Sequence, residues 1–151
     1  MNRLYASAFL VTFLLASVDL IFACTYWHQL FGVSWSRLVQ NIASGLLGKR
    51  SFEGGTQTVA LGLLLHYLMM AMMVGAFYVA STRMPALNER PWQSGLLYGA
   101  VLFVVMNLIV VPLSAAPKAP IVPSWIAASI VVHLLIGVAI AHGARSVLRA
   151  T

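Results

Sequence analysis

Four polar side chains lie inside long apolar runs of this sequence, and their types could do chemistry: Asp19, His66, Asn107 and His133. A carboxylate beside imidazoles in a membrane can exchange protons near neutral pH, because histidine changes its charge between about pH 5 and 8. The same groups can instead form a charge-assisted hydrogen bond that joins helices, with Asn107 completing the network. The four residues therefore fit two roles, which are helix packing and a pathway for protons or a solute.

The histidines also suggest a metal or haem site. His66 and His133 could be the axial ligands of a b-type haem. His66, Met69, Met70 and Met73 share one helical face, and thioethers with imidazole suit Cu(I). Methionine in an apolar span more often packs than binds a metal, and no known haem or copper spacing is present. Both cofactors are therefore secondary hypotheses.

The composition is that of an integral membrane protein. Hydrophobic residues make up 61% of the 151 residues and charged residues only 8%, with a mean hydropathy of +0.91, whereas a soluble domain carries about 25% charge. A chain of this length builds one bundle, because each helical crossing takes about 20 residues. We expect a single integral membrane domain over residues 1–151.

Charge and motifs exclude several classes of function. Nine basic residues oppose three acids, for a net charge of +6, but they are scattered between the apolar runs, which favours membrane anchoring over nucleic acid as a partner. The single cysteine, Cys24, excludes an internal disulfide and any multi-cysteine metal motif. No nucleophile motif, phosphate loop, zinc pattern or dinucleotide fingerprint is present, so nothing favours an enzyme.

Four apolar runs position the polar residues, and they predict an all-α bundle of four transmembrane helices. The predicted spans are residues 5–25, 58–81, 95–111 and 125–142. The first run could be mistaken for a signal peptide, but Asp19 interrupts its apolar core, so we expect an uncleaved helix. Pro112 should close the third span, and a stiff proline-rich loop should lead to the fourth.

Residues 34–48 have a helical pattern of their own. Apolar side chains recur at helical spacing on one side and polar ones lie opposite, with Ser34 as cap and Gly48 as stop. This predicts an amphipathic helix in the membrane interface between the first two spans, with Trp35, Arg37, Lys49 and Arg50 as the interfacial residues. The alternative is a helix that packs on the bundle as a lid.

The depths of the four polar residues agree. Asp19 and Asn107 lie past the centres of odd-numbered spans and His66 before the centre of an even-numbered one, each by about 6 Å, with His133 near mid-span. Because the helices alternate in direction, the four fall in one layer. Small residues on the same faces are typical of close helix packing in lipid, including Gly95, Gly99 and Gly137, so we expect the layer to point into the bundle.

Four spans place both termini on one side of the membrane. Arg3 directly precedes the first span, whereas residues 26–36 after it hold no basic residue. Basic residues favour the cytoplasmic side. We therefore predict cytoplasmic termini.

The middle of the chain resembles a group of known sequences. Residues 40–48, then Glu53, Gly54 and Gly55, and then Ala60, Leu61, Gly62 and His66 carry the likeness. The stretch is similar to small bacterial inner-membrane proteins with four spans, for which no activity is established. The resemblance implies a membrane bundle in a bacterial inner membrane and assigns no functional residue.

The leading hypothesis is a non-enzymatic membrane protein. In it, the layer of Asp19, His66, Asn107 and His133 tightens the bundle and supports a proton- or solute-linked role. The alternatives are a haem- or copper-binding redox subunit and an accessory subunit of a larger membrane complex. The expected partners are the lipid bilayer and a second copy or another membrane protein, with no nucleic acid.

Overall fold

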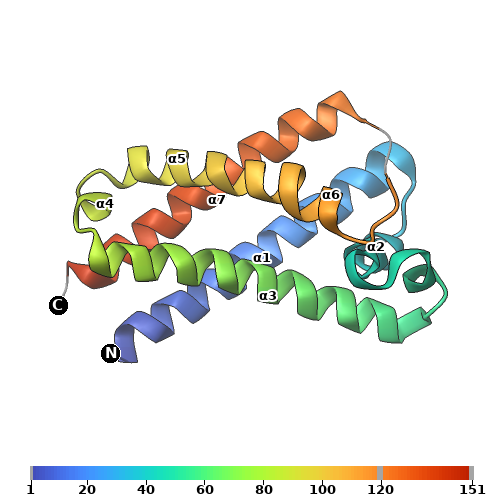
Figure 1. Cartoon of the computed structure of the whole chain (residues 1–151), viewed down its shortest axis with the longest axis horizontal. Coiled ribbons are helices and arrows are strands. Elements are labelled where there is room, and N and C mark those ends of the chain that lie inside the picture. Colours follow the sequence, from blue (N-terminus) through green and yellow to red (C-terminus); the bar gives the residue numbers. More distant parts are fainter. Residues whose placement is uncertain (1, 119–120, 150–151) are drawn as a thin grey trace.

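The computed structural model describes residues 2–118 and 121–149. Within these residues every regular element is helical. The order is α1 (Asn2–Phe31), α2 (Trp35–Leu47), the 3-10 helix η1 (Gly48–Phe52), α3 (Gly55–Arg83), α4 (Ala86–Glu89), α5 (Pro91–Val104), the π-helix η2 (Val105–Val110), α6 (Val111–Leu113) and α7 (Pro123–Leu148). Helix α1 begins and α7 ends at one end of the bundle, and α2 lies at the other (Figure 1).

Four helical segments of the described residues are long and apolar enough to cross a bilayer: Arg3–Phe31, Gly55–Arg83, Pro91–Leu113 and Pro123–Leu148. Large apolar side chains such as Phe9, Leu97 and Leu108 are exposed on their outer surfaces. In water an apolar surface of this extent would cause association, whereas in a bilayer it faces acyl chains. The fold is therefore that of a multi-pass membrane protein. All four segments extend beyond the spans predicted from hydropathy.

Helices α5 and α7 share the most extensive contact between helices of the described residues, because glycines remove the side chains between them. A Cβ atom on Gly137 would lie 2.5 Å from the Gly99 nitrogen, and one on Gly95 would lie 2.6 Å from Val138 Cα. Only hydrogen fits at such distances, which is the principle of small-residue packing in lipid. The two helices consequently approach backbone to backbone at these glycines.

The apolar core lies where α3 meets α1, α5 and α7. Its members are buried side chains from all four helices: Ala16, Met70, Val74, Phe77, Tyr78, Leu102, Ile136, Ile140, Ala141 and Ala144. Hydrogen bonds at its border also join the helices, since Tyr98 Oη of α5 donates to the Met73 carbonyl of α3 over 2.7 Å. Ser7 and Tyr78 are bonded over 3.0 Å.

Helix α2 packs along the N-terminal half of α3. A Cβ atom on Gly62 would collide with the Val39 carbonyl, so the two backbones touch there. Gln40 Nε2 donates to Thr58 Oγ1 and to the Gly55 carbonyl, both over 3.2 Å. The sequence grouped Gln40 and Ser44 with the polar side of this helix, but both are buried. Their burial follows from these contacts, since α3 covers that side.

The four residues predicted to be interfacial lie near this end of the bundle. Trp35, Lys49 and Arg50 are exposed. The guanidinium carbon of Arg37 lies 3.8 Å from the centre of the Phe52 ring, a cation–π geometry. This contact is local, and about half of the Trp35 surface is exposed.

The third span does not end at Pro112 as its proline suggested. Helical structure continues through α6 to Leu113, and residues 105–110 form a π-helix in which the Val111 amide donates to the Met106 carbonyl. Proline lacks the amide hydrogen that an α-helix needs, and a wider turn is a recognised way to accommodate the missing bond. The span therefore passes Pro112 by changing its local hydrogen bonding, and Asn107 lies within the altered turn.

Candidate functional site

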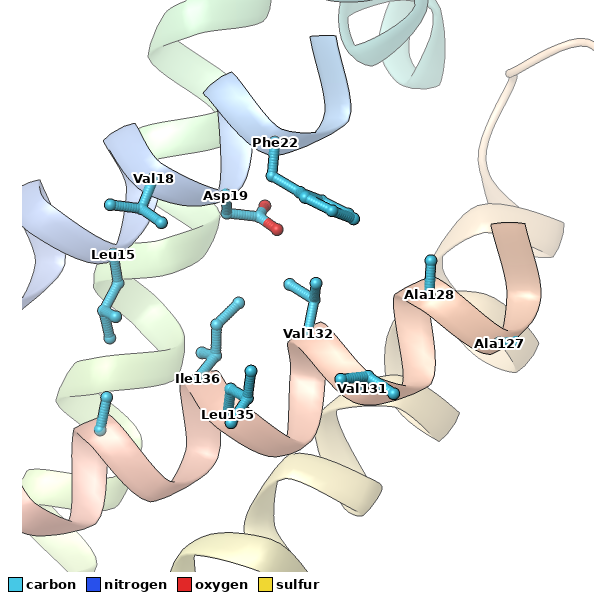
Figure 2. Close-up of a pocket in the computed structure, with 11 residues that line it drawn as sticks. Leu15, Val18, Asp19, Phe22, Ala127, Ala128, Val131, Val132, Leu135 and Ile136 are labelled. Atoms are coloured by element: carbon cyan, nitrogen blue, oxygen red, sulfur yellow. The ribbon is translucent and has the colours of Figure 1, made fainter. Parts of the chain in front are cut away.

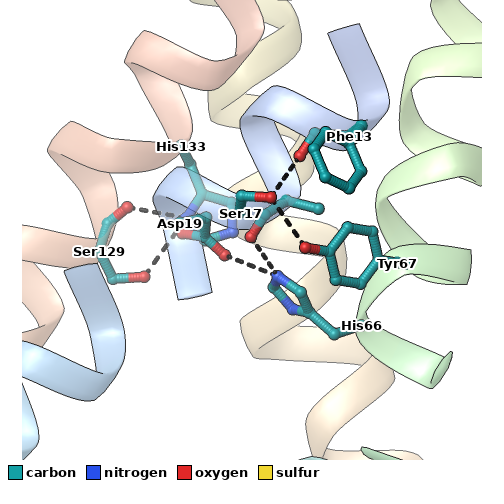
Figure 3. Close-up of polar contacts among 8 residues, drawn as sticks. Phe13, Ser17, Asp19, His66, Tyr67, Ser129 and His133 are labelled. Atoms are coloured by element: carbon teal, nitrogen blue, oxygen red, sulfur yellow. Dashed lines mark hydrogen bonds and ion pairs between the residues drawn. The ribbon is translucent and has the colours of Figure 1, made fainter. Parts of the chain in front are cut away.

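The structure brings Asp19 of α1 next to His66 of α3. His66 Nε2 lies 3.9 Å from Asp19 Oδ2 and 2.9 Å from the Ala16 carbonyl oxygen. A carbonyl oxygen only accepts, so Nε2 carries a hydrogen and donates it to Ala16 (Figure 3). At 3.9 Å the contact with Asp19 is too long for a hydrogen bond. His66 therefore joins α3 to α1 and is an electrostatic neighbour of the carboxylate.

His133 of α7 approaches the same carboxylate from another side. Its Nδ1 donates to the Ser129 carbonyl one turn earlier, over 2.8 Å. His133, Ser129 and Asp19 line a cavity of about 90 Å³, which Trp125 and neighbouring apolar side chains complete. Three of the four polar residues predicted to share a layer thus surround one point between α1, α3 and α7.

Asp19 itself has an unusual environment. It is the only one of the three acidic residues that lies inside a membrane-spanning helix, because Glu53 follows η1 and Glu89 belongs to α4. Its side chain is 25% exposed. Among the described residues no N–H or O–H group donates a hydrogen bond to its carboxylate. An ionised carboxylate in apolar surroundings is costly without such donors, so this group requires a cation or a proton.

A second network lies directly beside this cluster, and the sequence did not predict it. Ser17 Oγ donates to the Phe13 carbonyl over 2.8 Å, and Tyr67 Oη, also 2.8 Å away, donates to Ser17 Oγ (Figure 3). The ring of Tyr67 meets that of His66 edge to face, with centroids 5.9 Å apart. A serine two residues before Asp19 and a tyrosine adjacent to His66 were the available signal. They hold the two helices in register around the carboxylate.

Asn107 does not join this cluster. Its Nδ2 donates over 3.0 Å to the Phe103 carbonyl of its own helix, and within the described residues it forms no hydrogen bond with Asp19 or either histidine. Serine and asparagine commonly satisfy themselves in this way on the preceding turn. Helix α5 contributes Phe103 instead, whose ring meets the His133 imidazole edge to face at 5.7 Å.

A larger apolar groove adjoins the carboxylate. Its volume is about 680 Å³, and apart from Asp19 all the residues that line it are apolar: Leu15, Val18, Phe22, Ala127, Ala128, Val131, Val132, Leu135, Ile136 and Ala139. Figure 2 shows these side chains of α1 and α7 facing one another across the space. Asp19, Phe22 and Val132 line both this groove and the small cavity. The carboxylate thus lies where the two spaces meet.

The methionines proposed as copper ligands are placed differently. Met70 is buried in the core and Met73 packs against it, while Met69 is half-buried. Among the described residues no group of three or more histidine, cysteine, aspartate or glutamate side chains could hold a metal ion. Met70 and Met73 thus contribute to core packing, as flexible methionine side chains commonly do.

Comparison with protein-family models, curated proteins and solved structures gave no match. The likeness of the middle of the chain to small bacterial inner-membrane proteins therefore stays a prediction.

Proposed function

We propose that the chain is a non-enzymatic protein of the bacterial inner membrane in which Asp19, His66 and His133 exchange protons and link them to the movement of a solute. One observation carries the proposal. The sole acidic side chain within the spans has no hydrogen-bond donor among the described residues, yet two imidazoles flank it, one at 3.9 Å and one across a small shared cavity. Intramembrane ionisable groups of this kind typically mark ion or substrate pathways.

The physical reason for proton exchange is that the Asp19 carboxylate can be either ionised or protonated. When ionised it needs a nearby positive charge, and when protonated it is neutral and tolerated in an apolar setting. His66 from α3 and His133 from α7 are the titratable groups that face it, with Tyr67 bonded to the adjacent Ser17. Histidine readily gains and loses a proton near neutral pH. The cluster can therefore hold a proton in more than one arrangement.

The same cluster contributes to packing, and the two roles are compatible. The bond from His66 to the Ala16 carbonyl joins α3 to α1, and such interhelical bonds contribute about 0.6 kcal/mol on average. That contribution is small beside a whole bundle. Removing the carboxylate should consequently slow proton exchange while the helices remain assembled.

Proton flux into vesicles tests the proposal. The full chain is reconstituted into liposomes that contain a pH-sensitive dye, and a potassium diffusion potential drives proton entry. The wild-type protein should acidify the lumen about tenfold faster than Asp19→Asn, which corresponds to about 1.4 kcal/mol in the barrier. Glu53→Gln removes an equal charge from an exposed position and should leave the rate unchanged. Equal rates for wild type and Asp19→Asn would overturn the proposal.

Absorption and elemental analysis of the solubilised protein separate this function from a redox role. The proposal predicts a colourless protein without bound haem or copper. A haem spectrum or stoichiometric copper that disappears in both His66→Ala and His133→Ala would contradict a role in proton exchange and support a role in electron transfer.

The proposal includes an orientation and a place for α2. Cytoplasmic termini put α2 at the outer surface, where its exposed Trp35 and Leu46 would enter the interface while its buried side packs on α3. Aromatic side chains favour this region of a bilayer. A reporter that works only in the cytoplasm should be active when fused after the C-terminus. Activity of a periplasm-only reporter there would reverse the orientation.

A further inference from the structure

The groove between α1 and α7 has the size and the lining of a ligand site. Its volume of about 680 Å³ falls within the range of about 300–1,000 Å³ for small-molecule pockets. Val18, Val131 and Leu135 line it and are also exposed, so the groove opens on the outer surface of the bundle. In a membrane-spanning protein that surface is lipid, and an apolar molecule dissolved in the bilayer would enter sideways.

The Asp19 carboxylate determines which class of molecule fits the groove. A neutral acyl chain would fill the apolar space but leave the Asp19 carboxylate without a partner, and an anion would be repelled by it. A second copy of this chain offers no suitable charge either, because its nine basic residues all lie at or near the ends of the apolar spans or outside them. The partner that completes the groove is therefore positively charged and largely apolar.

Aromatic rings add to this preference. Phe22 lines the groove beside Asp19, and Trp125 lines the adjoining small cavity. The two rings stack with centroids 6.3 Å apart. A cation within about 6 Å of an aromatic face is attracted to it, more strongly where water is excluded. Among the described residues Asp19 is the one polar side chain that lines the groove, so the groove offers a cation a negative charge and aromatic faces rather than several hydrogen-bond partners.

We infer that the groove between α1 and α7 binds a hydrophobic organic cation, with its charge beside Asp19 and its apolar body against α7. This inference deepens the proposed function by naming the class of solute. It rests on that function only for transport, because binding is measured separately. A proton and the cation then compete for one carboxylate, which couples their movements.

Titration of the full chain in mild detergent with tetraphenylphosphonium tests the inference. The probe is permanently charged and carries no titratable proton. At pH 8 it should bind saturably with one molecule per chain. Neutral triphenylphosphine oxide should bind at least about tenfold more weakly, equivalent to 1.4 kcal/mol. Asp19→Asn should weaken tetraphenylphosphonium binding by a similar factor, whereas Glu89→Gln should not.

A matched pair of tryptophan substitutions tests the location without touching the charge. Leu135 lines the groove and is 60% exposed, and Leu64 on α3 is 65% exposed but lies outside it. Leu135→Trp should fill the groove and reduce binding about tenfold, while Leu64→Trp should leave it unchanged. Circular dichroism shows whether each variant keeps its helices, and the Leu135 variant keeps the test decisive if Asp19→Asn fails to fold.

Acidification provides a further readout whose sign follows from the groups present. A proton on Asp19 removes its negative charge, and protons on His66 and His133 add positive charge, so each weakens cation binding. Affinity should therefore fall as the pH is lowered. Absence of saturable binding, equal binding of the neutral probe, or unchanged binding by Asp19→Asn would each overturn the inference. Proton flux without tetraphenylphosphonium binding would refute the solute class alone, and binding without flux would refute the proposed function.

Discussion

Replacing Gly99 by alanine should loosen the contact between α5 and α7 and disturb His133. A Cβ atom at this position would lie 2.6 Å from Leu134 Cα and 3.0 Å from the His133 carbonyl carbon. These are backbone atoms, which cannot rotate away as side chains do. The helices must therefore separate by up to about 1 Å to restore normal contact, and overpacking of this kind typically costs about 1–3 kcal/mol.

Unfolding in mixed micelles with increasing dodecyl sulfate, followed by helicity, measures this cost. Gly75→Ala in α3 is the matched control, because a Cβ atom there meets nothing within 4 Å. It should change stability by no more than about 0.5 kcal/mol. If Gly99→Ala were as stable as Gly75→Ala, the close approach of α5 and α7 would not exist in the membrane protein.

The same variant should affect function beyond its loss of stability. Gly99 contacts the backbone of His133, so separation of the helices shifts the imidazole relative to Asp19. Proton flux per folded protein should fall about as much as in His133→Ala. Unchanged flux in a measurably destabilised Gly99→Ala protein would show that His133 takes no part in proton exchange.

Two smaller predictions concern the bonds that join the other helices. Tyr98→Phe removes the 2.7 Å bond to the Met73 carbonyl and should lower the free energy of unfolding in micelles by about 0.6 kcal/mol. Tyr5→Phe, on the exposed surface, should leave that free energy unchanged. If Tyr98→Phe also left it unchanged, another interaction would have replaced the lost bond. Gln40→Ala removes the bonds from α2 to α3 and should speed hydrogen exchange across Trp35–Leu47. Asn41→Ala, at an exposed position of the same helix, is the control. If the two variants exchanged at the same rate, packing alone would hold α2 against α3.

The number and place of the spans were predictable because a bilayer leaves the backbone few choices. A long apolar segment must satisfy its own hydrogen bonds, and a helix does so. Helix direction then alternates, so depth can be read by counting residues from the centre of each span. By this measure Asp19, His66 and His133 have the same depth in the membrane. In the structure the three side chains lie around one point. The predicted spans stop short of the helix ends, because each helix continues beyond the length that a bilayer requires.

Rotation about each helix axis was less predictable than depth. Asn107 has the expected depth, but it lies in the π-helix next to Pro112 and bonds to Phe103 in its own helix. A single wide turn alters the direction of every side chain within it. The burial of Gln40 likewise depends on where α3 passes, which no local pattern encodes. The groove lies between apolar surfaces of α1 and α7 that are not in contact along its length. Hydropathy is the same for apolar surfaces that touch and for those that leave a space.

The two sides of α7 explain why the carboxylate is left without a donor. On one side Gly137 lets α5 approach to backbone contact, so that helix pair has little freedom. On the other side Val131 and Leu135 face α1 across the groove, and beyond the groove the Tyr26 hydroxyl of α1 donates to Ser124 Oγ of α7 over 2.7 Å. Asp19 projects from α1 into the groove, while His66 donates its Nε2 hydrogen to the Ala16 carbonyl. Larger side chains would fill this gap, whereas at α5 the glycines let the two backbones approach directly. The open space beside the only acidic side chain in the spans is large enough to receive a molecule next to the carboxylate.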